Sequence, residues 1–532
     1  MFKRVKFYLA LLVAFIRRDK KKVTYVFTGA LLLIFFAKIL VPAGVPLIAQ
    51  AYTEFRKPTF TEGAVGTPQS PNPLFDTTET QRDISKLVFL GLTKVNSNGE
   101  LVPDLAENFE KISDTEYIFN LRRNIRWQDG QKFTSEDVVY TVKTAQNPKF
   151  ESPVAANFKD VKVERLGSYS VKFTLNEPFA PFPFATTIGV VPKHVSLKKY
   201  KPIGTGPFNV REITKSEVVL SSPNLNIAFK FYMNFEEAKT ALRLGEIHAL
   251  GGFSPQEIEQ VKNLGSEKIY QSLLPFRQVV VFFNTRFEDL KQKDVRQALN
   301  YAVDKDAIRR AAGGSESATS INQLPHHTWI QTLGRQRYPF DLKKAREKLK
   351  EAGYKLENGS VQKKGSELSL VITTSHDLEL SSTANLLKEQ WAKLGIEVKT
   401  SLVEAETLRN GLIKNRDFQI LVDFQDIPPD PDQYVLWHTT QTREANITGI
   451  SSAKLDKLLE DGRKTDDQKD RGSRYKLFTT LLLDESPAIF LYYPQYIWAV
   501  AKKVSGIDLA EFARPVDRFN SYKNWKIEPK LF

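Results

Sequence analysis

Between residues 368 and 424 the chain alternates short apolar runs with segments of helical periodicity. The runs "LSLVITTS", "IEVKTSLV" and "FQILVDF" have the length and composition typical of strands. Ala384, Leu387 and Trp391 recur at helical spacing between the first two runs, Gly395 supplies a stop, and "EAETLRNGLIKNRD" is a second helix. The order strand, helix, strand, helix, strand predicts a parallel sheet with right-handed crossovers, and therefore an α/β fold.

Three other segments carry helix signals. "TSEDVVYTVKTAQNP" begins with Thr134 or Ser135 as N-cap and stops before a proline. "DLKKAREKLKEAGY" begins in the same way, with Asp341 as its cap. "KDVRQALNYAVD" places apolar residues, Val303 among them, on one helical stripe. These are structural features and indicate no chemistry by themselves.

The run "DFQDIPPDPDQY", Asp423 to Tyr434, follows the last of the predicted parallel strands and is called the acidic turn below. Its prolines donate no backbone hydrogen bond and push the preceding residues out of the helical region, so it is neither helix nor central strand. Open parallel sheets bind ligands just beyond the carboxyl ends of their strands. The acidic turn is therefore a candidate binding segment.

The N-terminus carries two apolar runs around "RRDKKK". Residues 1–22 are predicted to be a cytoplasmic or interfacial basic segment, because the first run is too short to span a bilayer core of about 30 Å. Residues 23–41 reach about 28 Å as a helix and predict a transmembrane span, followed by a linker at 42–60. The preceding basic cluster places the bulk of the chain outside the cytoplasm. The alternative is a signal peptide cleaved after Ala51, in the small-x-small pattern "AQA".

Composition is that of a globular protein: 532 residues, 41% hydrophobic and 26% charged. No cysteine is present, which excludes disulfides, thiol nucleophiles and a lipid on an N-terminal cysteine. The net charge is +14, but eight basic residues and one acidic residue before Val23 supply half of it. The rest is spread thinly without basic blocks interleaved with aromatic residues, so nucleic-acid binding is not expected.

The search for catalytic and cofactor motifs is negative. The six histidines include no HExxH and no i,i+4 pair, and the adjacent His326 and His327 are better explained as a surface pair than as metal ligands. "GTGPFNV" lacks the third glycine of a dinucleotide fingerprint, and neither GxxxxGK nor GxSxG occurs. We expect no cofactor, no metal and no catalytic residues. The residues favour a binding protein, with an enzyme as the minority interpretation.

Several segments in a fixed order resemble the extracytoplasmic solute-binding proteins of the peptide/nickel class, family 5, the receptors of ABC importers for peptides. The matching stretches include "LVPDLAENFEKISDTEYIFNLRRNIRWQDGQKFTSEDVVYTVKTAQNP", "PIGTGPFNV", "ALRLGEIHAL", "FFNTRFEDLKQKDVRQALNYAVDKDAI", "DIPPDPDQY" and "DESPAIFLYYPQYIWAV". The resemblance covers nearly all of the chain after residue 60. It implies a two-lobed fold of the type II periplasmic-binding-protein kind with an extra subdomain. The implied parts are lobe I at 61–85, 195–278 and 489–532, the extra subdomain at 86–194, and lobe II at 279–488.

The resemblance also implies binding residues. In peptide-binding members, an aspartate in this turn pairs with the ligand's α-ammonium group, and by position that residue is most like Asp426. Two departures from the family pattern are present: Asp423 stands where a tryptophan is usual, and an additional proline separates Asp426 from Asp430. The other implied ligand contacts are Phe424, Gln425, Thr78, Glu79, Thr80, Tyr434, Trp437, Tyr493 and Arg335. The facing residues could equally belong to the core, and that interpretation is favoured for Trp437. Arg335 and the nearby Arg337 could meet a ligand carboxylate, but they are better explained as solvated charges.

The predicted function is a membrane-tethered, extracytoplasmic receptor that captures peptides or peptide-like solutes between two lobes. Its expected partners are the ligand, the permease subunits of an ABC importer and the membrane. Two alternatives stay open: a tethered sensor or scavenging binder without a permease, and an enzyme on the same scaffold. Sequence alone does not identify the ligand.

Overall fold

The structure is a computed structural model that describes residues 57–195, 202–314, 318–326, 328–330, 336–441 and 445–528. The chain divides into two compact units, Met1–Pro58 and Thr59–Phe532. The predicted segments 1–22 and 23–41 and the alternative cleavage site at Ala51 lie outside the described residues, as does most of the predicted linker 42–60. Within the described residues, no helix combines the length and apolarity needed to cross a membrane.

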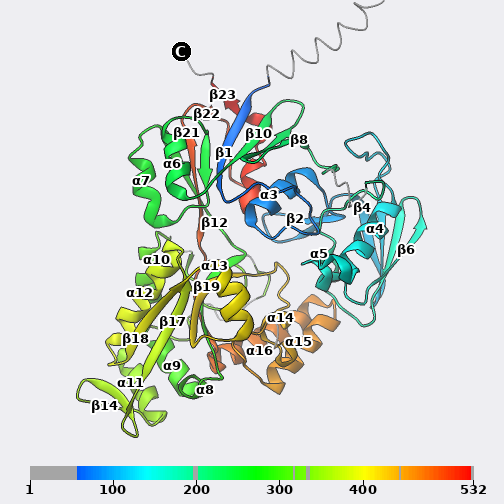
Figure 1. Cartoon of the computed structure of the whole chain (residues 1–532). Coiled ribbons are helices and arrows are strands. Elements are labelled where there is room, and N and C mark those ends of the chain that lie inside the picture. The colour runs from blue at the N-terminus through cyan, green and yellow to red at the C-terminus, as the bar shows by residue number, and fades with distance from the viewer. Residues whose placement is uncertain are drawn as a thin grey trace, which may run out of the picture. The chain divides into compact units, whose positions relative to one another are not determined.

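The unit from Thr59 onward is built on two large sheets, each the centre of one lobe (Figure 1). The first lobe contains a seven-stranded sheet in the order β12-β21-β11-β1-β10-β9-β8. Strand β1 is parallel to β10 and β11, and the remaining pairs are antiparallel. The strands are β1 Thr59–Val65, β8 Asn209–Ile213, β9 Glu217–Ser221, β10 Asn226–Tyr232, β11 Ala249–Gly251, β12 Glu267–Leu273 and β21 Gln495–Ala501.

Helices flank this first sheet, and short strand pairs accompany it. They are α3 Glu79–Val88, α6 Phe235–Arg243, α7 Ile258–Lys262, η4 Pro255–Glu257, η8 Pro515–Phe519, η9 Tyr522–Asn524, β2 Thr93–Val95, β3 Leu101–Pro103, β22 Val504–Ser505 and β23 Lys526–Ile527. One apolar cluster packs α6 and α7 on the sheet, around Leu242 and Ile497. Another lies on the opposite side, around Phe60, Trp498 and Trp525.

The second lobe contains a five-stranded sheet in the order β18-β17-β19-β13-β20. Strand β17 is parallel to both β18 and β19, which confirms the predicted parallel arrangement of the three strand segments between residues 368 and 424. Strand β13 runs antiparallel to β19 and β20. The strands are β13 Arg277–Phe283, β17 Ser369–Ser375, β18 Glu397–Val403, β19 Ile420–Asp426 and β20 Ala488–Tyr492.

Helices cover both faces of the second sheet, giving three layers (Figure 1). On one face α9, α11 and α12 pack around residues such as Leu299, Leu349 and Trp391. On the other, α14, α15 and α16 pack around Trp437 and Phe478. The helices and small strands of this lobe are α8 Glu288–Lys291, α9 Lys293–Tyr301, α10 Lys305–Ala311, α11 Leu342–Glu351, α12 Leu378–Ala392, α13 Ala405–Thr407, η6 Leu408–Ile413, α14 Tyr434–Trp437, η7 Thr439–Gln441, α15 Ala453–Lys464, α16 Gln468–Glu485, β14 Lys355–Glu357, β15 Ser360–Lys363 and β16 Ser366–Glu367.

Two of the predicted helices begin where the sequence indicates, and the observed helices differ from the prediction in two details. Thr134 caps α4 (Ser135–Gln146) in a capping box, and Asp341 caps α11. The segment after Glu404 is helical but continues from α13 into the π-helical turn η6, for which the sequence offers no explanation. Helix α9 ends at Tyr301, so Val303 is buried beyond the helix and not on its stripe.

A four-stranded antiparallel sheet, β4-β5-β7-β6, forms the extra subdomain together with α4 and smaller helices. Its inward side chains, such as Phe119 and Phe173, are fully buried. The elements are β4 Ala106–Ser113, β5 Glu116–Leu121, β6 Lys162–Gly167, β7 Ser170–Thr174, α4 Ser135–Gln146, α5 Phe182–Ala185, η1 Pro148–Phe150 and η2 Ala155–Phe158.

Two short segments connect the large sheets, residues 274–276 between β12 and β13 and residues 493–494 between β20 and β21. They are bonded to each other, since the N–H of Leu274 donates to the carbonyl of Pro494 at 2.9 Å. The few backbone torsions of these two segments therefore determine the orientation of one lobe relative to the other. Such paired connections are the geometry of a hinge.

Candidate functional site

Arg277 joins predicted binding residues of the two lobes. It is the first residue of β13 and stands directly opposite Asp426, the last residue of β19, in the antiparallel ladder. Its Nε lies 2.7 Å from Oδ1 of Asp426, and its Nη1 lies 2.8 Å from Oε2 of Glu79, in the first turn of α3. Glu79 belongs to the first lobe and Asp426 to the second, so one guanidinium holds a carboxylate from each.

This group of three side chains has an excess negative charge, because two carboxylates share one guanidinium. Burial works to lower the pKa of Arg277, but Asp426 and Glu79 raise it above its ordinary value, so the arginine stays charged. The side chain of Asp426 is 67% exposed. Its Oδ2 has no hydrogen-bond partner in the part of the chain that the structure describes. That oxygen is free to accept a hydrogen bond from a cationic group.

The residues before Asp426 on β19 alternate between the two faces of the sheet. Asp423 is partly buried and accepts a hydrogen bond from the N–H of Phe424 at 2.8 Å; burial raises its pKa to about 6. The ring centroid of Phe424 lies 6.0 Å from Cζ of Arg277. Gln425 donates to the carbonyl oxygen of Asp426 at 2.7 Å. Phe424 and Asp426 therefore share the face that contacts Arg277, whereas Asp423 and Gln425 lie on the opposite face of the strand.

Two further carboxylates lie just after the carboxyl end of β17. Asp377 caps α12 and accepts from the N–H groups of Glu379 and Leu380 at 2.9 and 3.0 Å. Glu379 is only 5% exposed, and burial raises its pKa to about 8. Its Oε1 has no hydrogen-bond partner among the described residues. The carboxyl ends of β17 and β19 thus form one acidic edge.

The rest of the acidic turn is structural. Asp430 is buried in a two-pronged ion pair with Arg471 of α16, at 2.7 and 3.1 Å. Asp432 pairs with Arg463 of α15 at 2.8 Å, and both side chains are largely buried. These two carboxylates fasten the turn to the helices beneath it. The four aspartates of the turn, alike in the sequence, therefore have different roles.

Several predicted contacts have structural partners. Thr78 is the N-cap of α3, in a capping box with Gln81, and Thr80 lies partly buried in the first turn of that helix. Trp437 is buried in the core of the second lobe, where its Nε1 donates to Gln433 at 2.9 Å. Tyr493 lies in a hinge segment, and its hydroxyl donates to the carbonyl of Leu324 at 2.7 Å. We therefore assign structural roles to Thr78, Trp437 and Tyr493, and these roles do not depend on a ligand.

Tyr434 takes part in a contact between the extra subdomain and the second lobe. The guanidinium of Arg463 lies between two rings, 4.0 Å from the centroid of Tyr434 and 4.6 Å from that of Phe179. On its other side the Tyr434 ring stacks on His438, with centroids 4.0 Å apart. Phe179 precedes α5 of the subdomain, so this cation–π stack spans two parts of the chain.

Two further interactions accompany the stack. The N–H of Ala180 donates to the carbonyl of Arg463 at 2.8 Å. Lys111, on β4, forms an ion pair with Asp466, in the connection between α15 and α16. Together these interactions are called the Arg463 contact below. Sequence reasoning missed Arg277, Phe179 and Arg463, because no local pattern marks a residue whose partner is far along the chain.

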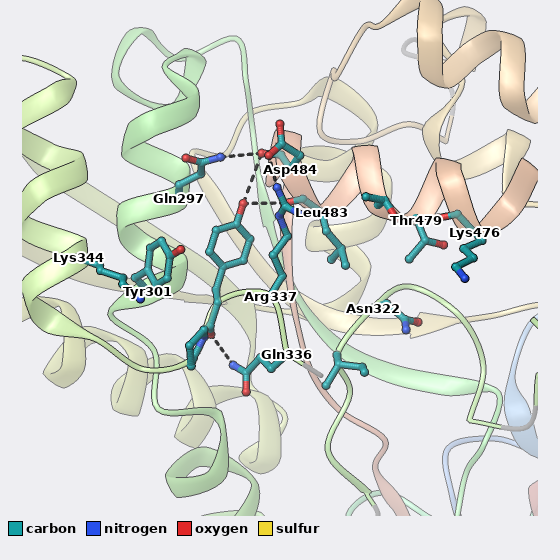
Figure 2. A pocket seen from close by; sticks show the side chains of 14 residues that line it. Gln297, Tyr301, Asn322, Gln336, Arg337, Lys344, Lys476, Thr479, Leu483 and Asp484 are labelled. Carbon is teal, nitrogen blue, oxygen red and sulfur yellow. Dashed lines mark hydrogen bonds and ion pairs between the residues drawn. The ribbon is translucent and has the colours of Figure 1, made fainter. Parts of the chain in front are cut away.

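The predicted Arg335 lies outside the described residues. The neighbouring Arg337 pairs with Asp484 at the end of α16, in a different part of the second lobe (Figure 2). Within the described residues, no group of three His, Cys, Asp or Glu side chains has the geometry to hold a metal ion. The exposed carboxylate of Asp426 at Arg277 suits an organic cation, which carries its own hydrogen-bond donors.

Comparison with known proteins agrees with this architecture. The chain matches the family model described as bacterial extracellular solute-binding proteins, family 5 Middle, over residues 100–446. Among curated proteins it is 25% identical over 496 residues to the oligopeptide-binding protein AppA of Bacillus subtilis, covering 87% of this chain and 90% of the relative. It is also 25% identical over 497 residues to a dipeptide-binding protein of Escherichia coli, covering 83% and 90%.

Solved structures include similar chains that align over nearly their whole length. The ABC transporter substrate-binding protein CtaP of Listeria monocytogenes has a TM-score of 0.77 and 25% identity, over 89% of this chain and all of that one (100%). NikZ of Campylobacter jejuni, solved with Ni(L-His), has a TM-score of 0.74 and 27% identity, over 88% and 99%. The two-lobed α/β architecture is thus that of periplasmic binding proteins.

Proposed function

Since this chain belongs to the bacterial extracellular solute-binding proteins of family 5, we propose that it captures a peptide or peptide-like solute between its two lobes and delivers it to an ABC importer. The curated relatives above are named for oligopeptides and dipeptides, which supports a peptide ligand. NikZ was solved with a nickel–histidine complex, so a small chelate is the second ligand class considered.

One observation carries the peptide proposal: Arg277 holds Glu79 and Asp426 from opposite lobes. A ligand ammonium group beside the free oxygen of Asp426 would neutralise the excess charge of this group. A cation that interacts with carboxylates of both lobes binds more tightly when the lobes are together, so the ligand favours the closed form. Asp426 thus stays our proposed ammonium partner, with Glu79 as its counterpart from the first lobe.

The other predicted contacts fall into two groups in this proposal. Asp423, Phe424 and Gln425 lie on the same strand and would border the ligand's first residue. Tyr434, which the Arg463 guanidinium contacts at 4.0 Å, would contribute instead by holding the subdomain against the second lobe in the closed form that we propose. We retain the predicted division into lobe I, extra subdomain and lobe II at 61–85 with 195–278 and 489–532, 86–194 and 279–488.

The N-terminal segment completes the proposal: residues 23–41 anchor the chain in the membrane, with the binding lobes outside the cytoplasm. Full-length protein should stay with membranes after a carbonate wash, whereas a chain that starts near residue 55 should be soluble and folded. A native N-terminus found at Tyr52 would instead show cleavage after Ala51.

The function is tested by identifying what the purified extracytoplasmic part binds. Mass spectrometry of co-purified compounds, followed by calorimetry with synthetic di- to nonapeptides, should give a saturable peptide ligand. A metal chelate as the only ligand would support the second class. Hydrolysis of the peptides by the protein would support an enzyme. Loss of peptide uptake when a neighbouring permease gene is deleted would support a transport receptor rather than a sensor.

A further inference from the structure

Helix α3 carries two carboxylates one turn apart, Glu79 and Asp83. Residues four apart lie on the same face of a helix. Glu79 pairs with Arg277, the first residue of β13 in the second sheet, whereas Asp83 pairs with Arg518 of η8. Helix η8 lies beside α3 in the first lobe (Figure 1). The contact between Asp83 and Arg518 therefore lies wholly within the first lobe and holds in any arrangement of the two lobes.

Arg518 joins α3 to β1, the middle strand of the first sheet. Its Nη1 donates to Oδ2 of Asp83 at 2.5 Å, and its Nε and Nη2 lie 2.9 and 2.7 Å from Oε1 of Glu62, on β1. All three residues are buried, with exposed fractions of 6% or less. Burial works to lower the pKa of Arg518, but Glu62, Tyr496 and Asp83 raise it well above its ordinary value. One charged guanidinium thus bridges the helix and the strand.

The geometry of this buried group suits a positioning role. Burial raises the pKa of Asp83 to about 7, but its Oδ2 can accept a hydrogen bond from Arg518 in either protonation state. A buried ion pair adds little stability over apolar packing of similar volume. The rigid fork of a guanidinium, by contrast, defines the positions of both of its acceptors. The group therefore determines where α3 lies on β1.

The segment "GTGPFNV", which is no dinucleotide fingerprint, holds the other end of α3. The N–H groups of Gly206 and Phe208 donate to the carbonyls of Val88 and Leu87 at 2.8 and 3.2 Å. A Cβ atom at Gly204 would lie 1.8 Å from the carbonyl oxygen of Val88, so only glycine permits this close approach. Helix α3 is thus held in the first lobe both at its end and beside its cleft-facing first turn.

We propose that Arg518 is a positioning residue for peptide capture. Through Asp83 it holds α3 on β1, so that Glu79 keeps the position at which it meets the ammonium group of the ligand. A carboxylate that is in place before the ligand arrives reduces the cost of ordering on binding. This inference rests on the proposed function, in which Glu79 is the first-lobe counterpart of Asp426. Arg518 itself does not touch the ligand.

The position of α3 can be measured without a ligand. Because the chain has no cysteine, Arg82→Cys on α3 and Lys268→Cys on β12, both at exposed positions, take spin labels specifically. Asp83→Ala frees α3 but leaves Arg518 and Glu62 as a balanced pair, so the protein should fold and the distribution of label distances should broaden. Arg518→Lys, which cannot bridge both carboxylates, should broaden it as well. Asp83→Asn keeps an acceptor for Arg518 and should retain the parent's distribution. An unchanged distribution in both Asp83→Ala and Arg518→Lys would overturn the inference.

Binding shows whether the position of α3 acts through Glu79. The probes are trialanine and N-acetyl-trialanine, measured by titration calorimetry with the full-length protein. Asp83→Ala should weaken trialanine binding about tenfold, because the contact is no longer preorganised. In a Glu79→Gln background it should have no further effect, whereas a merely structural loss would weaken binding in both backgrounds. Asp137→Ala, which removes a buried carboxylate from α4 of the subdomain, is the control and should bind trialanine as the parent does.

The outcomes separate this inference from the proposed function. If trialanine does not bind the parent saturably below about 10 mM, or if N-acetylation and Glu79→Gln both leave its affinity unchanged, the proposed role of Glu79 fails and this inference falls with it. If both changes weaken binding but Asp83→Ala does not, only the positioning role of Arg518 is refuted. An equal loss in Asp83→Asn and Asp83→Ala would also refute it, because the charge of Asp83 would then act on the ligand directly.

Discussion

Arg277 and Asp426 are cross-strand partners in the ladder between β13 and β19, and their side chains form a 2.7 Å ion pair at its end. The pair occupies only one oxygen of the carboxylate. Asp426 is therefore held in place by Arg277 while its second oxygen stays available. Opposed charges on neighbouring strands also stabilise the pairing of the strands themselves.

The first prediction concerns the affinity for a peptide with a free amino terminus. Asp426→Asn removes the negative charge but keeps the size of the side chain, so we expect the protein to fold and to bind such a peptide about 30- to 1000-fold more weakly, or roughly 2–4 kcal/mol. N-acetylation of the peptide should weaken its binding to the parent protein by a similar factor and change its binding to the variant little. The reason is that the acetyl group and the Asp426→Asn substitution remove the same interaction. Titration calorimetry of the four combinations measures this.

Asp417→Asn is the matched control for that cycle. Asp417 is exposed just before β19, at the opposite end of the strand from Asp426. Its substitution makes the same change in net charge and should leave affinity unaltered. Equal binding of the free-amino peptide by Asp426→Asn and the parent would refute Asp426 as the ammonium partner.

A second prediction concerns the Arg463 contact, which joins the subdomain to the second lobe. Lys111→Glu places two carboxylates together, since Lys111 pairs with Asp466, and should shift the ligand-free protein toward an open form. The double variant Lys111→Glu/Asp466→Lys restores opposite charges and should recover much of the closed population. Phe179→Ala should also favour opening, because it removes one ring from Arg463.

The absence of native cysteine makes this measurement clean, because paired labels can be introduced without background. Energy transfer between dyes on the two lobes should report a larger mean separation in Lys111→Glu. The swap of Lys172 with Glu116, an ion pair inside the subdomain sheet, should have no effect on the separation. If Lys111→Glu and Phe179→Ala both keep the parent's dye separation, the Arg463 contact does not control closure.

The third prediction concerns stability. Asp430 and Arg471 are both less than 10% exposed, so Asp430→Ala leaves a buried guanidinium without its partner. We expect the free energy of unfolding to fall by about 3–5 kcal/mol. The double variant Asp430→Ala/Arg471→Met removes the buried charge as well and should recover most of the loss. Urea unfolding of the two variants decides this; a loss below about 1 kcal/mol would mean that water reaches the arginine.

Much of the fold follows from local sequence signals. The helix caps at Thr134 and Asp341 depend on interactions between residues that are close in the sequence. The strands β17, β18 and β19, whose parallel order was predicted, are each recognisable from the side-chain periodicity of one segment. The capping box of Thr78 with Gln81 has the same local character. Its threonine–x–x–glutamine pattern was available in the sequence as evidence for a structural role.

The site was less accessible to such reasoning. Arg277 precedes Asp426 by 149 residues, and only the register of β13 against β19 places them together. Asp426 and Asp430 are indistinguishable in the sequence, because what separates them is the arrival of Arg471 from α16. A charge's role is fixed by its tertiary partners, which single-segment patterns do not contain.

The last prediction concerns the dependence of stability on pH. Burial raises the pKa of Glu379 in the folded protein from its ordinary 4.5 to about 8. Between these values the folded state holds a proton that the unfolded state has lost, so the free energy of unfolding falls as the pH rises from 4.5 toward 8. The difference corresponds to roughly 4–5 kcal/mol at most. Glu379→Gln keeps the shape without titrating, so its stability should decline less over this range than that of the parent.

Urea unfolding at pH 5 and pH 8.5 measures both declines. Glu406→Gln, an exposed position on α13, serves as the matched control and should follow the parent. The stabilising effect of Glu379→Gln relative to the parent should thus be small at pH 5 and largest at pH 8.5, because only at the higher pH does the parent bury a charged carboxylate. Parallel pH profiles for Glu379→Gln and the parent would show that Glu379 is solvated or already ionised at pH 5.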